Sequence, residues 1–351
     1  MRVLLGYDDV FVAHDTGLGH PERPDRLRAV LEGVADVGLG SDLVVFSPTP
    51  ADDAALLRVH SPEHLARVSE AASMSLRLDP DTPTSTRSEE AARVAAGAGL
   101  DAIDRLRAGE ADSAFLAVRP PGHHARPEGA MGFCLFNNIA ISAARLVAEG
   151  ERVLIVDWDA HHGNGTQEAF YGSGDVLFVS MHQSPYYPGT GAWTEGGVGA
   201  GLNTTLNLPF PAGTAGDAYR RAFDDVVVPA AELFSPTWVL VSCGFDAHRD
   251  DPLTDLGLSA GDFGDLTERT LELAVPGRRL FFLEGGYDYD ALRIAAAATI
   301  SALAGERRAT ERVTGATLAG SRPVPDHDKA ETVTAHIARR LQDEGFAVWS
   351  K

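Results

Sequence analysis

The chain has 351 residues and a net charge of −20, and nearly all of its positive side chains are arginine, because Lys329 and Lys351 are the only lysines. This acidic balance argues against nucleic acid as a partner, since phosphates need a basic surface. Cys134 and Cys243 are too few for a disulfide framework and fit a reducing compartment. Because the N-terminus lacks the apolar run of a signal peptide and no segment reaches transmembrane length, we expect a cytoplasmic protein without a membrane partner.

Short apolar runs alternate with longer segments of helical spacing or helix-forming composition along most of the chain. The predicted strands lie near residues 2–6, 43–46, 114–118, 153–156, 176–180, 238–242 and 280–283. The predicted helices include residues 24–36, 62–76, 88–107, 137–149, 216–233, 262–274 and 288–303. Repeated alternation of strand and helix predicts an α/β fold, in which helices flank a mostly parallel central sheet.

The chain shows no linker, repeat or low-complexity tract before about residue 305. We therefore expect one catalytic domain over residues 1–305. Residues 306–351 are polar at first and become helix-like at about 326–343. We interpret them as a C-terminal helical appendage that packs on the domain or mediates assembly.

The stretch Arg152–Gly165, with the sequence RVLIVDWDAHHGNG, is the most informative part of the chain. Its apolar run at 153–156 is typical of a strand that is buried on both faces. In an open α/β sheet, ligands bind at the carboxyl ends of the strands. Alternation along an extended chain sends Asp157, Asp159 and His161 to one side. Because carboxylate oxygen and imidazole nitrogen suit Zn²⁺ or a similar divalent ion, we expect a metal site here.

Four other predicted strands are also followed by unusual polar loops. These loops are RPPGHHARPEGAMGFC (119–134), MHQSPYYPGTG (181–191), CGFDAHRDDPL (243–253) and EGGYDYD (284–290). Functional residues gather on loops that a rigid scaffold positions. We therefore expect five strand ends to converge on one site.

Together these stretches resemble the histone deacetylase and acetylpolyamine amidohydrolase family, and most of all its class II deacetylases and their bacterial histone deacetylase-like amidohydrolase relatives. The matching stretches follow in the family's order: HPERPDR (20–26), RPPGHHA (119–125), GFCLFNN (132–138), DWDAHHGNGTQ (157–167), YYPGTG (186–191), GFDAHRDDP (244–252) and LEGGY (283–287). The resemblance implies a single arginase/deacetylase-like α/β domain with its active site at the carboxyl ends of the strands. It also implies metal-dependent hydrolysis of an acylated amine.

The resemblance implies two bound cations. One Zn²⁺ per chain, which Fe²⁺ could replace in the cell, would have Asp159, His161 and Asp246 as ligands and one position left open. A structural K⁺ would take oxygen ligands, as a hard cation prefers. The residues that the family match assigns to it are Asp157, Asp159, His161, Ser180 and Met181.

The resemblance also assigns catalytic residues. His123 and His124 match the family's histidine pair, with Asp157 and Asn164 as their partners; class I enzymes have aspartate in place of Asn164. A carboxylate raises the pKa of an imidazole more than an amide does, so we expect a cationic His123 and a neutral His124 that acts as general base. Tyr287 matches the tyrosine that donates a hydrogen bond to the oxyanion.

The remaining matches concern a narrow substrate tunnel and the space below the metal. Phe133 and Tyr187 align with two aromatic residues that would hold the methylene stem of an acyl-lysine by apolar burial. Tyr187 departs from the family's usual phenylalanine. The other matched positions are Gly132 and Leu253 in the tunnel wall, Asp81 at the rim and Arg26 beside an internal cavity.

These matches predict a zinc-dependent deacylase that removes acetyl, or a similar small acyl group, from a lysine side chain in a peptide or protein. Deacetylation of a polyamine or another small metabolite is the nearest alternative. Leu253 leans against a polyamine, because the polyamine-selective class II enzyme has an acidic residue there. The short segment between 62–76 and 88–107 also has no room for the dimer-forming insertion of the bacterial polyamine enzymes.

Two further alternatives differ in chemistry. An arginase-like hydrolase with two manganese ions needs additional ligands and leaves Tyr287 without a role. A catalytically silent binder of acylated lysine would not need the intact set of catalytic residues. The oligomeric state stays open.

Overall fold

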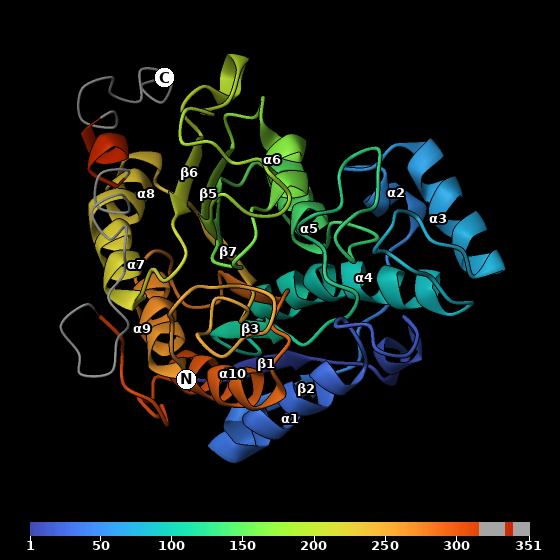
Figure 1. Ribbon diagram of the computed structural model, residues 1–351, viewed down its shortest axis with the longest axis horizontal. Helices are drawn as coiled ribbons and strands as arrows, with labels where there is room; N and C mark the ends of the chain where they lie inside the picture. Colours follow the sequence, from blue (N-terminus) through green and yellow to red (C-terminus); the bar gives the residue numbers. More distant parts are fainter. Residues whose placement is uncertain (316–333, 340–351) are drawn as a thin grey trace.

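One sheet of eight strands forms the centre of the molecule in the computed structural model, which describes residues 1–315 and 334–339 (Figure 1). The strand order is β2-β1-β3-β8-β7-β4-β5-β6, and every pair of neighbours is parallel. The strands are β1 (Val3–Gly6), β2 (Leu43–Phe46), β3 (Ser113–Leu116), β4 (Val153–Asp157), β5 (Val176–Gln183), β6 (Thr205–Phe210), β7 (Trp238–Cys243) and β8 (Arg279–Leu283).

Helices cover both faces of this sheet (Figure 1). They are α1 (Asp25–Val37), α2 (Asp53–Leu56), α3 (Pro62–Met74), α4 (Ser88–Arg107), α5 (Asn138–Ala148), α6 (Asn164–Phe170), α7 (Gly216–Ala222), α8 (Val228–Phe234), α9 (Ala260–Leu271) and α10 (Tyr289–Leu303). Helix α1 packs against α10 and α10 against α9, whereas α4 packs against α5. In the part of the chain that the structure describes, no helix is both long enough and apolar enough to cross a membrane.

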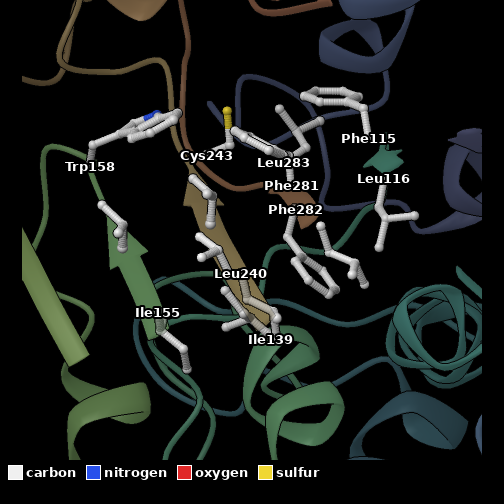
Figure 2. Packing of buried hydrophobic residues seen from close by; sticks show 14 of the residues in the cluster. Phe115, Leu116, Ile139, Ile155, Trp158, Leu240, Cys243, Phe281, Phe282 and Leu283 are labelled. Carbon is white, nitrogen blue, oxygen red and sulfur yellow. The ribbon is translucent and has the colours of Figure 1, made fainter. Parts of the chain in front are cut away.

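The central strands are mostly apolar because helices cover them on both sides, and their polar residues, Ser113, Asp157, Ser242 and Arg279, lie at or next to a strand end. Every residue of β3, β4, β7 and β8 is buried. Successive residues of β8 point to opposite faces: Phe281 lies near Trp158, and Phe282 points the other way, towards Ile139 (Figure 2). Polar side chains can therefore gather only where these strands end.

The predicted α/β fold with its parallel central sheet is confirmed, and the structure adds one strand. The sheet is wholly parallel, and β6 is missing from the strands predicted from sequence, because Asn207 and Pro209 interrupt its apolar pattern. Strand β6 lies at the edge of the sheet and pairs only with β5, a position where a strand tolerates proline. The predicted helix at 216–233 is present as α7 and α8, joined by a π-helical turn at Phe223–Val227.

Part of the chain after residue 305 packs on the body. The Glu311 carboxylate lies 2.9 Å from His248 Nε2, accepts a hydrogen bond of 2.8 Å from the Ala260 N–H and pairs with Arg249. Residues 334–339 are helical, and Ile337 is fully buried. The rest of the helix predicted at 326–343 lies outside the described residues, and the domain boundary at 305 stays a prediction.

We expect Glu311→Ala to lower the free energy of unfolding of the full chain by about 1–3 kcal/mol, because buried His248 and the Ala260 N–H both lose their acceptor. Urea denaturation measures this change. Arg307→Ala is the matched control in the same segment, since its ion pair with Glu268 lies at the surface, where such pairs contribute little. Equal midpoints for the two variants would show that the Glu311 contacts do not stabilise the fold.

Candidate active site

The five polar loops singled out in the sequence follow five strands that are adjacent in the sheet, in the order β3, β8, β7, β4 and β5. Because all the strands are parallel, their carboxyl ends lie along one edge. Asp159 and His161 follow β4, and Asp246 follows the neighbouring β7. Residues that are far apart in the sequence therefore meet at this edge.

Asp159, His161 and Asp246 form a compact buried group whose ligand atoms all lie within 4.8 Å of one another. His161 Nδ1 is 3.1 Å from Asp159 Oδ1 and 2.9 Å from Asp246 Oδ2. Main-chain donors orient both carboxylates: Gly285 N–H donates to Asp159 Oδ2 at 2.8 Å, and Ala160 N–H donates to Asp246 Oδ1 at 2.7 Å. The ligand atoms are thus held in place by the backbone.

This donor set fits a zinc ion. Zinc binds imidazole nitrogen and carboxylate oxygen, and its catalytic sites have three protein ligands. Two carboxylates buried this closely are costly unless a cation pairs with them. Burial and the neighbouring Asp159 charge raise the pKa of Asp246 more than the contacts with His161 and the Ala160 N–H lower it, a balance that a bound cation would reverse.

His123 and His124 lie beside this group with their ring centroids 4.0 Å apart. His123 Nδ1 is 3.0 Å from Asp157 Oδ2, and His124 Nδ1 is 2.8 Å from Asn164 Oδ1. Burial lowers the pKa of both imidazoles. For His123 the neighbouring aspartates outweigh burial, so its pKa lies well above the usual value. For His124 the nearby histidines add to burial, so its pKa lies well below the usual value.

Tyr287 faces the same site from the loop after β8. Its N–H donates to Asp251 Oδ2 at 2.7 Å, and its ring meets that of Phe133 edge-on at 6.0 Å. The Arg26 guanidinium lies 4.9 Å from the ring centroid and donates through Nε to the Gly286 carbonyl at 2.6 Å. Burial raises the pKa of Tyr287 well above its usual value, so the hydroxyl stays protonated and able to donate.

The residues predicted to line the tunnel lie next to the histidines. The Tyr187 ring meets His124 edge-on at 5.3 Å and His161 at 6.1 Å. Phe133 follows Gly132, and both adopt positive φ angles, of 69° and 55°. A Cβ at Gly132 would lie 2.5 Å from the His124 ring, so a side chain at this position would displace that histidine.

Two further tunnel predictions concern Asp81 and Leu253. The Asp81 carbonyl is 3.1 Å from His20 Nε2, and the His20 ring packs edge-on against Phe133 at 4.8 Å. The Leu253 carbonyl accepts a hydrogen bond from the hydroxyl of Tyr186, which precedes Tyr187 in the chain. The contact of Asp81 and Leu253 with a substrate stays a prediction.

The residues predicted to hold potassium come from neighbouring strands. Asp157 of β4 and Ser180 of β5 are register partners, and both are buried. Ser180 Oγ is 3.0 Å from His182 Nδ1. The carbonyl of Met181 accepts a long hydrogen bond of 3.5 Å from the Tyr219 hydroxyl. Ser180 thus lies beside Asp157, the partner of His123, and K⁺ itself stays a prediction.

Three buried acids near the site received no role from sequence. Glu22 forms ion pairs with Arg26 and Arg119. Asp251 accepts a hydrogen bond from the Tyr287 N–H, and Glu284 accepts one from the Gly122 N–H. All three belong to stretches that carry the family resemblance. The resemblance, however, does not indicate which charged residue of a stretch faces inward, and all of these contacts except Glu22–Arg26 join residues remote in sequence.

Comparison with known proteins supports this description. The histone deacetylase domain family matches residues 20–303. The histone deacetylase-like amidohydrolase of Pseudomonas aeruginosa is 40% identical over 301 residues, which cover 83% of this chain and 78% of that protein. Histone deacetylase 15 of Arabidopsis thaliana is 39% identical over 318 residues, which cover 88% of this chain and 57% of that protein.

A solved structure described as the HDA15 HD domain superposes with a TM-score of 0.86 at 35% identity and covers 97% of this chain and 95% of that one. The whole described architecture is therefore shared with a known structure.

We expect the protein to bind one zinc ion per chain and Asp246→Asn to weaken zinc binding by at least about 100-fold, because it replaces a charged ligand. Competition with a chromophoric chelator measures the affinity. Asp250→Asn is the control: it lies in a second histidine–carboxylate group, with His248 and Glu311, in which Arg249 already pairs with Glu311. Two ions per chain, or equal affinities for the variants, would contradict this assignment.

Proposed function

The chain belongs to the histone deacetylase family of hydrolases, and from this premise we propose that it removes acetyl, or a similar short acyl group, from the side chain of lysine in peptides or proteins. The observation that carries the proposal is the unequal histidine pair beside the metal-binding group. His123 is paired with a carboxylate and His124 with an amide, at 3.0 and 2.8 Å. In amide hydrolysis a cation can stabilise the developing negative charge, and a neutral base can move the proton.

In His124, Nε2 is the nitrogen that can act as the base. Because Asn164 Oδ1 can only accept, the proton of neutral His124 sits on Nδ1, and Nε2 keeps its lone pair. His124 Nε2 takes a proton from the attacking water and later delivers it to the leaving amine. Asp159, His161 and Asp246 would hold a zinc ion, which would polarise the acyl carbonyl and lower the pKa of water.

Two residues stabilise the negative charge that forms on the acyl oxygen. The Tyr287 hydroxyl donates a hydrogen bond to that oxygen, a contribution typically worth about 100-fold or more in rate. Cationic His123, fixed by Asp157, adds a positive charge close by. A potassium ion held near Asp157 and Ser180 would keep the loop after β4 in place and tune His123 through its partner.

The substrate class is inferred from the tunnel. Phe133 and Tyr187 supply aromatic surface for an aliphatic stem, which acyl-lysine and acylated polyamines share. Leu253 provides no negative charge for a distant ammonium group, and this favours lysine. The protein's excess of acidic residues acts in the opposite direction, since it attracts polycations.

We expect kcat/KM of the zinc-loaded protein to be larger for an acetyl-lysine peptide than for acetylated spermidine or putrescine. Tyr287→Phe should lower kcat about 100-fold with little change in KM, because the hydroxyl acts on the transition state. Tyr289→Phe is the matched control and should keep the wild-type rate. Faster cleavage of the polyamines would show the interpretation of Leu253 to be wrong. A full zinc complement with no turnover of any acylated amine would favour the silent-binder alternative.

We expect Asn164→Asp to move the acid limb of the kcat/KM profile to higher pH by about one unit or more. In the wild type, the low pKa of His124 keeps the base unprotonated below the usual pKa of histidine, and the rate falls only as pH drops through that low value. A carboxylate at position 164 raises this pKa, so the rate is lost at higher pH. Asn203→Asp, which adds the same charge elsewhere, should leave the limb in place. An unmoved limb in Asn164→Asp would remove His124 as the base.

A further inference from the structure

Glu284 is a fully buried acid that the proposed mechanism does not use. It follows β8, and its side chain reaches the loop after β3 that carries the histidine pair. Glu284 Oε2 accepts hydrogen bonds from the N–H groups of Gly122 at 2.7 Å and His123 at 3.2 Å. Its other oxygen, Oε1, has no hydrogen-bond partner among the described residues.

The position is costly for a carboxyl group. Burial raises the pKa of Glu284 to about 7. The nearby Arg26 guanidinium donates to the main-chain carbonyl of Glu284, so it gives the carboxyl group no direct ion pair. An apolar side chain of similar size would avoid this desolvation cost. The cost points to a role for the acceptor atom at this position.

The first N–H groups of the loop after β3 need a hydrogen-bond acceptor from another part of the chain. Pro120 and Pro121 have no N–H, so Gly122 and His123 carry the first main-chain donors after them. Glu284 binds both donors. On the other side, a Cβ at Gly122 would lie 2.6 Å from Asn138 N, so the chain is confined between α5 and the Glu284 carboxyl group.

The same short segment also contacts the other parts of the site. Gly285 N–H donates to the ligand carboxylate of Asp159 at 2.8 Å, and Tyr287 follows two residues later. The main chain at 284–287 therefore bears the oxyanion donor, orients a metal ligand and, through Glu284, holds the histidine loop. The distances between the Tyr287 hydroxyl, the Asp159 carboxylate and the histidine loop therefore depend on the path of this one segment.

We propose that Glu284 is a positioning residue for the histidine pair. By binding the main chain of Gly122 and His123, it sets where the imidazoles of His123 and His124 lie relative to Asp159 and Tyr287. It acts through the histidines and does not touch the reacting atoms. The inference rests on the proposed function of the pair.

The test compares two replacements of similar size in the full, zinc-loaded chain. Glu284→Leu removes the acceptor, whereas Glu284→Gln keeps an amide oxygen that can accept from both N–H groups. We expect Glu284→Leu to lower kcat about 100-fold, because a misplacement of about 1 Å costs that much, while KM changes less than about threefold. Glu284→Gln should restore most of kcat. Zinc content and thermal midpoint, measured in parallel, report whether each variant is folded.

Ser113→Ala is the matched control, because Ser113 Oγ is another buried oxygen without a partner among the described residues, at the amino end of β3. It should keep the wild-type kcat. A wild-type kcat in Glu284→Leu, or equal losses in the Leu and Gln variants, would overturn the proposal.

A second measurement separates this proposal from the proposed function. In protein with ¹⁵N-labelled histidine, the Nδ1 proton shared by His123 and Asp157 should give a resonance that shifts in Glu284→Leu and returns in Glu284→Gln. If the wild type cleaves no acylated amine, the proposed function fails, but this resonance still tests the placement of His123. An unshifted resonance in Glu284→Leu would overturn the positioning role.

Discussion

The close approach of the Gly285 main chain to two buried carboxylates is the constraint on which the site depends. Gly285 donates its N–H to Asp159 Oδ2, and a Cβ at this position would lie 2.2 Å from Asp246 Oδ2 and 2.7 Å from Asp159 Oδ2. No other residue type fits there without moving a ligand. Glu284 precedes this glycine and accepts hydrogen bonds from the histidine loop, and Tyr287 follows two residues after it. The chain between β8 and α10 therefore contacts the candidate metal ligands and the histidine loop and carries Tyr287.

The parallel sheet makes this arrangement possible. Strands β8, β7 and β4 are neighbours in register, so the residues that follow them leave the sheet at the same level. Helices on both faces exclude water from the strands, which forces their interiors to be apolar and leaves the carboxyl edge as the place for charged groups. A rigid scaffold therefore holds groups that would otherwise repel one another.

Sequence predicted the parts of the site that depend on order along the chain. Asp157 ends a recognisable buried strand, and Asp159 and His161 follow it. The family motifs supplied the pairings of His123 with Asp157 and His124 with Asn164, both of which are present as hydrogen bonds. The contacts of Glu284 with Gly122 were not predictable, because they join residues 162 positions apart through main-chain donors. Strand β6 was missed for a different reason: its stability comes from pairing with β5 rather than from its own pattern.

Charge balance explains why the same residue type behaves differently at adjacent positions. Asp157, Asp159 and Asp246 bring three fully buried carboxyl groups together, and the neighbouring aspartates raise the pKa of His123 well above its usual value, which favours a positive charge there. The two negative charges that remain would be neutralised by one divalent ion. A second divalent ion would leave positive charge without a buried partner, a costly state in a low-dielectric interior. His124 differs because its Nδ1 faces the uncharged Asn164 amide, and both burial and the neighbouring histidines lower its pKa, so the same residue type favours the neutral form one position further along the chain.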